Sequence, residues 1–175
     1  MKPTMITLMA YENLAVAKHA KEKWNSVSDA LKDDCASELR LWKFAALSHP
    51  ELSAVAVRDA VNAEIIMVAT SGTAELPSEV TAWIEQWLAE RAAKAEVTGL
   101  VVFLCFPSDE ASGAFAISQF AHLQRAARKG SMDFLATTST APSTPLEVRV
   151  TDTVLPVAFK VTGKAVVQTV PMRHY

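Results

Sequence analysis

The sequence predicts an α/β fold in which helices cover both faces of a five-stranded parallel sheet. Five short apolar runs without a helical period are typical of buried strands, at residues 5–11, 38–47, 64–70, 98–106 and 132–138. Between them, apolar residues recur every three or four positions, as they do in amphipathic helices. Strands that alternate with helices indicate parallel strands joined by right-handed crossovers, and hence three layers, α/β/α.

The first half of the chain contains two of these units. The strand MITLMAY precedes a helix expected over residues 13–31. After the second strand, ELRLWKFAAL, Ser48 and Glu51 form a predicted capping box with Pro50 in the first turn, and this helix is expected to run to about Ala63. The apolar stripe expected to bury the first helix consists of Leu14, Ala17, Ala20, Trp24, Val27 and Leu31.

The second half repeats the pattern. EIIMVAT is the third strand, and Pro77 opens a third helix. TGLVVFLCF is the fourth strand, a fourth helix is expected over residues 112–129, and Gly130 suits its C-cap before the fifth strand. The third helix should bury Val80, Trp83, Ile84, Trp87 and Leu88, and the fourth helix Phe115, Phe120, Leu123 and Ala127.

Five strands within the first 138 residues favour the flavodoxin-like strand order 2-1-3-4-5. We expect residues 1–138 to form this α/β domain. Residues 139–175 are expected to be a Thr/Ser/Pro-rich linker and a C-terminal β extension, with a hairpin that turns near Thr162 and Gly163.

No helix is predicted after the fifth strand. In a 2-1-3-4-5 sheet a fifth helix normally shares one face with the first helix, so its absence should expose apolar side chains over strands three to five. Such a patch is larger than soluble monomers usually tolerate. We therefore expect the C-terminal hairpin or a second copy of the chain to cover it, which predicts a homodimer.

Composition excludes several functional classes. A formal net charge of -2 gives no basic surface for nucleic acid or anionic membranes. Cys35 and Cys105 match no metal or redox spacing and are expected to be small buried residues, so no metal site and no cofactor is expected. No run approaches the roughly 20 apolar residues of a membrane span, and the N-terminus does not resemble a signal peptide, so a cytoplasmic location is expected.

A binding site is expected at the carboxyl ends of the strands, near the switch between strands one and three. The Thr-Ser-Gly-Thr run after strand three offers hydroxyls near a helix N-terminus, which suits an anion. It lacks the pattern of a P-loop, of a dinucleotide fingerprint and of a nucleophile elbow. An ordinary turn is favoured, and a ligand contact stays open. The candidate ligand-binding residues are Glu12, Asn13, Thr70, Ser71, Thr73 and Asp109.

Two further features have a structural interpretation. His49 as a general base would need a nucleophile within reach and a group to orient its ring, and its place in the predicted capping box favours a structural role. Trp83 and Trp87 stand at helical spacing among core residues, so packing is favoured over a cofactor platform.

The run MITLMAYENLAVAKHAKEKW is similar to the first strand and helix of response-regulator receiver domains, with Glu-Asn where these carry an acidic pair. GSMDFLATT resembles their fifth strand, and the likeness covers about residues 5–138. Receivers accept a phosphoryl group on an aspartate that closes strand three, where this chain has Ala69 or Thr70. Asn13 replaces one magnesium-binding acid, and Thr137 stands in place of a lysine. The resemblance implies a degenerate receiver that does not depend on phosphorylation.

The sequence also resembles uncharacterised bacterial proteins with an LW-F pattern in the second strand and an LP…W pattern in the third helix, here LWKF and LPSEVTAWIEQWL, which implies no function. Two hypotheses stay open. One is a non-catalytic interaction or regulatory module that self-associates and does not use a receiver-type aspartate. The other is a small-molecule or nucleotide-binding enzyme with its site at the carboxyl ends of strands one and three. Whether the chain has any enzymatic activity, or a further protein partner, is left open by the sequence.

Overall fold

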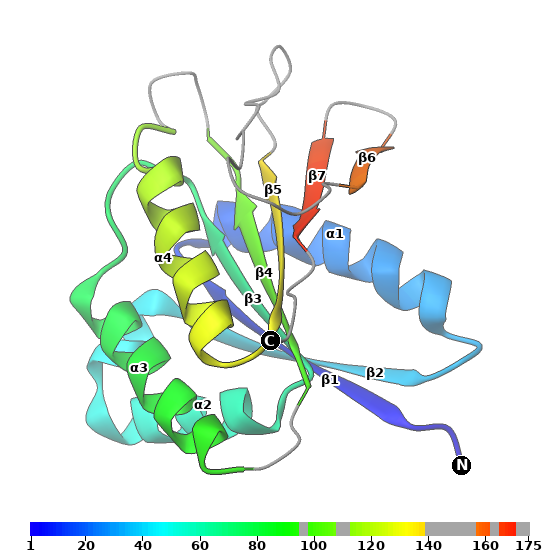
Figure 1. The fold of residues 1–175 in the computed structure, drawn as a ribbon, viewed down its shortest axis with the longest axis horizontal. Helices are drawn as coiled ribbons and strands as arrows, with labels where there is room; N and C mark the ends of the chain where they lie inside the picture. Colours follow the sequence, from blue (N-terminus) through cyan, green and yellow to red (C-terminus); the bar gives the residue numbers. More distant parts are fainter. Residues whose placement is uncertain (95–97, 108–112, 139–156, 162–164, 171–175) are drawn as a thin grey trace.

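A computed structural model describes residues 1–94, 98–107, 113–138, 157–161 and 165–170 (Figure 1). Its sheet has the order β2-β1-β3-β4-β5-β7-β6. The first five strands are parallel: β1 (Thr4–Tyr11), β2 (Ala36–Lys43), β3 (Ile65–Thr70), β4 (Leu100–Cys105) and β5 (Asp133–Thr138). The helices are α1 (Leu14–Leu31), α2 (Pro50–Asn62), α3 (Ser78–Ala92) and α4 (Ala116–Lys129), with a 3-10 helix η1 (Phe44–Ser48). The α/β class and the flavodoxin-like order 2-1-3-4-5 are confirmed.

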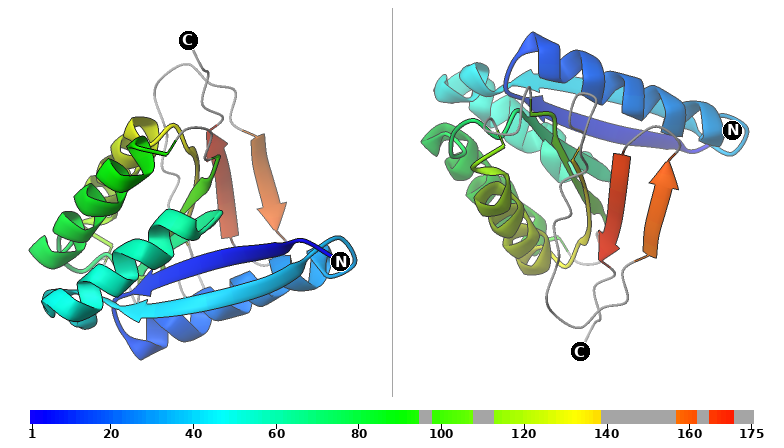
Figure 2. Two further views of the ribbon diagram at one scale, coloured as in Figure 1. Left: turned by 90° about the horizontal axis from the view of Figure 1, so that it is seen from below. Right: turned by 90° about the horizontal axis from the view of Figure 1, so that it is seen from above.

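Helices α2, α3 and α4 lie on one face of the sheet and α1 lies on the other (Figure 2). The larger core fills the first face and includes Phe103 and Phe134 of the sheet together with Trp83 and Trp87 of α3. The two tryptophan rings meet edge to face with centroids 6.0 Å apart, so their predicted packing role is confirmed. All five residues of the predicted α3 stripe are buried.

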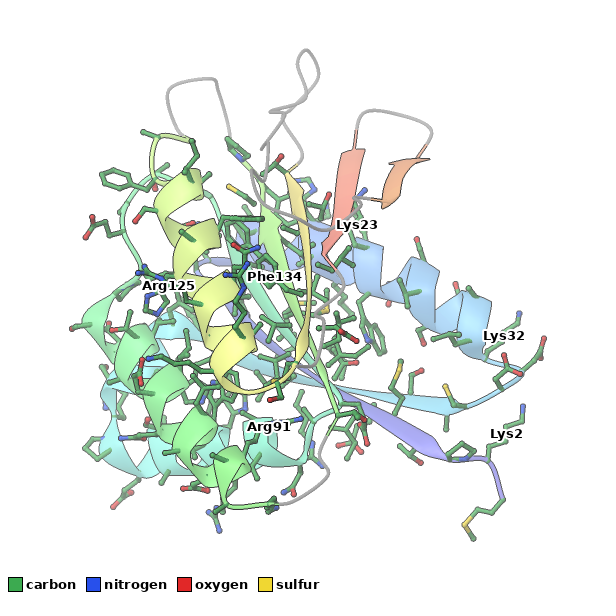
Figure 3. All side chains as sticks on the ribbon, in the orientation of Figure 1. Lys2, Lys23, Lys32, Arg91, Arg125 and Phe134 are labelled. Carbon is green, nitrogen blue, oxygen red and sulfur yellow. The ribbon has the colours of Figure 1, made fainter. Side chains whose placement is uncertain are left out.

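Arg91 is a buried cation that joins α3 to the end of α2 (Figure 3). Its Nη1 donates to the carbonyls of Ala60, Val61 and Ala63 at 3.0, 3.3 and 2.8 Å, and Nη2 donates to Thr98 O at 3.3 Å. The carbonyls of Ala60, Val61 and Ala63 stand at the C-terminus of α2, where a helix has unpaired acceptors. Burial lowers the pKa of Arg91.

The second strand is shorter than predicted. β2 ends at Lys43, and the apolar residues that follow form η1, in which Phe44 and Leu47 are buried three positions apart. An apolar run does not distinguish a strand from a 3-10 turn of this length. The predicted capping box is wrong, because the Ser48 hydroxyl donates to Ala45 O at 2.7 Å and His49 is the N-cap of α2 without a side-chain bond.

Two predicted helix faces need correction. In α1, Val16 and Ala20 are the buried residues, whereas Leu14 and Val27 are exposed. The spacing of three and four fits either stripe, and only the way the helix lies on the sheet decides between them. In α4, Phe120 is buried with Leu123 and Ala127 as predicted, but Phe115 is the exposed N-cap residue instead of a core residue.

Gly130 is the C-cap residue of α4, as predicted, and donates its N–H to Ala126 O at 3.0 Å. Its φ is −84°, and the left-handed residue is Ser131, with φ 52°. A Cβ on Gly130 would lie 2.9 Å from Leu88 Cδ2, so Leu88 would have to move. Close packing of α4 against α3 therefore favours glycine here.

The C-terminal strands form the predicted hairpin. β6 (Val157–Val161) and β7 (Ala165–Val170) pair antiparallel, and β7 pairs antiparallel with β5. The residues of the predicted turn, Thr162 and Gly163, lie outside the described ranges, and so do residues 139–156, which contain the predicted linker. The hairpin extends the sheet beyond β5 (Figure 2). The domain boundary at residue 138 stays a prediction.

The expected open patch over strands three to five is not exposed. On the α1 face of β3 and β4, the exposed fractions of Met67, Ala69, Val102 and Leu104 are 5%, 0%, 5% and 2% within a single chain. We expected either the C-terminal hairpin or a second copy of the chain to cover this face, and these side chains are buried without a second copy. They leave no exposed apolar patch on β3 and β4 to drive dimerisation, so self-association needs a different surface.

Candidate functional site

The carboxyl ends of β1 and β3 lie side by side, because Tyr11 of β1 pairs in register with Ala69 of β3. The backbone N–H of Glu12 continues this pairing with a bond of 3.1 Å to Ala69 O. The sheet thus brings together five of the six candidate residues, those at positions 12, 13, 70, 71 and 73. Asp109 lies outside the described residues. That these residues bind a ligand stays a prediction.

Glu12 holds the turn that follows β3. Its Oε2 accepts from the backbone N–H of Ser71 at 2.5 Å and from the Ser71 hydroxyl at 2.7 Å. The same hydroxyl lies 2.9 Å from Thr73 Oγ1. Gly72 between them has φ 71°, a left-handed conformation that glycine adopts without strain. Bonds to a carboxylate are among the stronger hydrogen bonds in proteins, so this turn is firmly fixed.

Asn13 serves the adjacent helix. Its Oδ1 accepts from Val16 N at 3.0 Å, which makes it the N-cap of α1. Asparagine is one of the preferred residues for this position because its side chain satisfies a backbone N–H that has no partner within the helix. Asn13, which the resemblance matches to the second acid of the receivers' acidic pair, is therefore a helix cap.

Gln119 of α4 is a buried polar residue that the sequence reasoning missed. Thr70 is 1% exposed, and its hydroxyl donates to Gln119 Oε1 at 2.7 Å. Gln119 Nε2 donates in turn to Ala74 O at 2.6 Å. The backbone adds one bond, from Phe115 N to Gly72 O at 3.0 Å. Gln119 interrupts an otherwise apolar stripe of α4, and that interruption was the available signal.

Cys105 closes β4 next to this network and is fully buried. The pKa of its thiol is raised to about 11, chiefly by burial; a hydrogen bond with Thr70 acts to lower it and the charge of Glu12 to raise it. The thiol is therefore protonated near neutral pH, and a protonated thiol is a poor nucleophile and metal ligand. Cys35 is half-buried, less than expected.

His49 lies at the start of α2, where it lines a shallow surface hollow with Pro50, Glu51 and Leu52. Its side chain makes no capping bond, so its predicted structural role is not seen. Within the described ranges, no three histidine, cysteine or acidic side chains are grouped so that they could hold a metal ion.

Among the residues that the structure describes, no helix is both long and apolar enough to cross a membrane. No model of a known protein family matches this sequence, and no curated protein matches it either.

Proposed function

We propose that this chain is a non-catalytic interaction or regulatory module of receiver-like type, which self-associates and is not phosphorylated on a receiver-type aspartate. The observation that carries the proposal is the double hydrogen bond from Ser71 to the carboxylate of Glu12. This acid follows β1 directly, and it is the acid among the described candidate residues that could serve a ligand between β1 and β3.

A carboxylate that binds a metal or moves a proton must direct free lone pairs towards the ligand. Glu12 Oε2 uses its lone pairs within the chain, and Thr70 and Asn13 are committed to Gln119 and to the start of α1. A ligand that used Glu12 Oε2, Thr70 Oγ1 or Asn13 Oδ1 would have to replace these bonds before it gained its own. The polar groups at the strand ends therefore serve best as braces of the β3–α3 turn.

The same geometry supports independence from phosphorylation. Thr70 closes β3, in the place where receivers carry the acceptor aspartate, and its hydroxyl already donates to Gln119. Thr137 occupies β5 where the resemblance expects a lysine, and it is buried. Neither residue offers the charge that phosphoryl transfer to an aspartate needs.

Intact-mass analysis tests this part of the proposal. The full chain is incubated with a small phosphodonor, acetyl phosphate, and Mg²⁺, beside a receiver domain that accepts phosphate from it. We expect no phosphoryl adduct on this chain. A stoichiometric adduct that maps to the ends of β1, β3 or β4 would overturn the proposal.

A thermal-shift panel of nucleotides, flavins and phosphorylated metabolites tests the small-molecule alternative. A ligand at about 100 times its dissociation constant adds roughly 2.7 kcal/mol of stability, which such an assay detects. We expect no stabilisation. A shift that disappears in Glu12→Ala would establish a ligand site at the strand ends and replace the proposal.

Sedimentation velocity tests self-association. The full chain is run over a concentration series from below one to about a hundred micromolar, a range chosen to bracket the affinities of ordinary protein dimers. We expect a reversible monomer–dimer equilibrium. A monomer at every concentration would contradict the proposal.

A further inference from the structure

β2 is the terminal strand of the sheet on its parallel side. It pairs with β1 along its whole length, from Ala36 opposite Thr4 to Lys43 opposite Tyr11. Backbone N–H and C=O groups of a strand point alternately to its two sides, so half of those in β2 point away from β1. A long edge strand of this kind is a template for pairing with another chain.

Charged residues of both signs alternate on the α2 face of this edge. Arg40 Nε lies 2.7 Å from Glu38 Oε1, and Arg40 Nη1 lies 2.7 Å from Asp59 Oδ1 of α2. Trp42 Nε1 also donates to Asp59, at 2.9 Å. The Asp59 carboxylate thus holds Arg40 in place at the rim of the sheet. The side chains of Glu38 and Arg40 are 48% and 32% exposed, so a second chain can reach both.

The opposite face of β2 carries two leucines, between Ser37 and Lys43. Leu39 is half-buried against the α1-side core, and Leu41 is 48% exposed. These residues alternate along the strand with Glu38 and Arg40, so the edge presents opposite charges on one face and leucines on the other.

Two copies of an edge strand that pair antiparallel about a two-fold axis place facing residues on the same face of the joined sheet. Centred on Leu39, this arrangement sets Glu38 opposite Arg40 of the second copy, and Arg40 opposite its Glu38. The two Leu39 side chains meet at the axis, and Leu41 faces Ser37. Opposite charges that face each other across strands stabilise the pair.

Other registers fit less well. Centring on Glu38 or on Arg40 sets like charges directly opposite each other, which is destabilising. Centring on Leu41 limits the ladder to residues 39–43 of β2, whereas centring on Leu39 uses residues 36–42. The register about Leu39 therefore combines the longer ladder with paired charges.

We propose that a second copy of this chain docks on the free edge of β2, antiparallel and centred on Leu39, so that one sheet continues across both copies. This inference rests on the proposed self-association and names its surface. It replaces the apolar sheet face that the structure shows to be buried.

Single-cysteine crosslinking tests the register in the full chain carrying Cys35→Ser, which removes the half-buried native thiol and leaves the buried Cys105. At the axis, facing Cα atoms lie about 4.5–5.5 Å apart, within the range that a disulfide spans. Residues 41 of the two copies would be four residues apart along the strands, about 14 Å, too far for a disulfide. Under mild oxidation Leu39→Cys should form a covalent dimer and Leu41→Cys should not, whereas Leu41→Cys mixed with Ser37→Cys should form a mixed one.

Charge reversal gives a second measurement that does not alter the leucines. In the Glu38→Arg variant, the new arginine of each copy faces Arg40 of the other copy, while the bond between Arg40 and Asp59 within each copy stays in place. We expect the dimer dissociation constant to rise by about tenfold or more, since two attractive pairs become repulsive. Glu90→Arg, the same change on the exposed surface of α3, should leave it unchanged.

The outcomes separate the two proposals. A dimer that crosslinks at position 39 and weakens with Glu38→Arg supports both. A dimer that crosslinks at position 41 alone or at neither position, and is indifferent to Glu38→Arg, overturns docking on β2 and leaves self-association standing. A monomer by sedimentation overturns both. If Leu39→Cys unfolds at a lower temperature than the unaltered chain, the effect of Glu38→Arg on the dimer dissociation constant alone decides whether the copies dock on β2.

Discussion

Replacement of Glu12 by alanine should destabilise the protein, because Glu12 fixes the turn after β3. Its Oε2 accepts two hydrogen bonds from Ser71, and the bonded groups are partly buried. The variant removes both bonds and leaves the Ser71 N–H without its partner. A structural role therefore predicts a loss of stability, whereas a residue kept for function often stabilises the fold when it is replaced.

The size of the loss follows from the contacts. A hydrogen bond to a charged group contributes about 1.5–3 kcal/mol, and partial access of water to Glu12 and Ser71 favours the lower value. We expect Glu12→Ala to lower the free energy of unfolding by about 2–3 kcal/mol. Glu12→Gln keeps an acceptor for both donors and loses only the charge, so its cost should be about 1 kcal/mol.

Urea denaturation followed by circular dichroism measures both values. Glu75→Ala is the matched control, because Glu75 is an exposed acid in the same loop, and exposed substitutions usually change stability by less than about 0.5 kcal/mol. An unchanged or raised midpoint for Glu12→Ala, with the slope unchanged, would refute the structural role of Glu12. It would favour the small-molecule hypothesis instead.

Three further predictions concern groups away from this turn. Arg91→Met should lower the free energy of unfolding by about 3 kcal/mol in urea, because the carbonyls at the end of α2 lose their donor; a loss below about 1 kcal/mol would contradict this. The pKa of Cys105 is raised from 9.0 to about 11, so the stability that its neutral thiol contributes should be lost as pH rises from 9.0 to about 11. Cys105→Ala should lose less stability over that range, and an identical pH profile would argue against the shift. Burial, followed by the charge of Arg125, lowers the pKa of His122 below 6.5. The free energy of unfolding should therefore fall as pH drops below 6.5. In thermal melts between pH 7 and pH 5, His122→Leu should make that fall smaller.

The order of elements was predictable because apolar periodicity reports directly on burial. Strands such as EIIMVAT and the Trp83–Trp87 stripe bury nearly every apolar residue, so their patterns are unambiguous. The prediction failed where two different local structures fit the same apolar pattern. The run after Lys43 suits a strand or a 3-10 turn, and α1 could bury either of two adjacent stripes.

The sequence predicted where the candidate site lies, but not whether its residues bind a ligand. Parallel strands end at the same edge of a sheet, so Glu12 and Ser71 had to approach each other. Whether they bind a ligand or each other depends on distances that no spacing reveals. Gln119 and Arg91 make their bonds across 49 and about 30 residues of sequence, and no local pattern reports on such partners.

Self-association was predicted as one of two ways to cover the sheet face left by a missing helix, and burial of Val102 and Leu104 within one chain removes this reason for a dimer. The strand order, which was predicted correctly, already placed β2 at an edge. The charges of Glu38 and Arg40 could then have suggested the partner surface that we propose, but the face on which they lie became clear only with the ion pair to Asp59.

Amide hydrogen exchange at Ser71, followed by NMR, tests most directly whether Glu12 is committed to this turn. The bond to Glu12 Oε2 predicts an exchange rate at least about tenfold slower than in an unstructured peptide, with the protection lost in Glu12→Ala. Exchange at the unstructured rate in the unaltered chain would show that the Glu12 carboxylate is free for a ligand, and it would contradict a non-catalytic role for the strand ends.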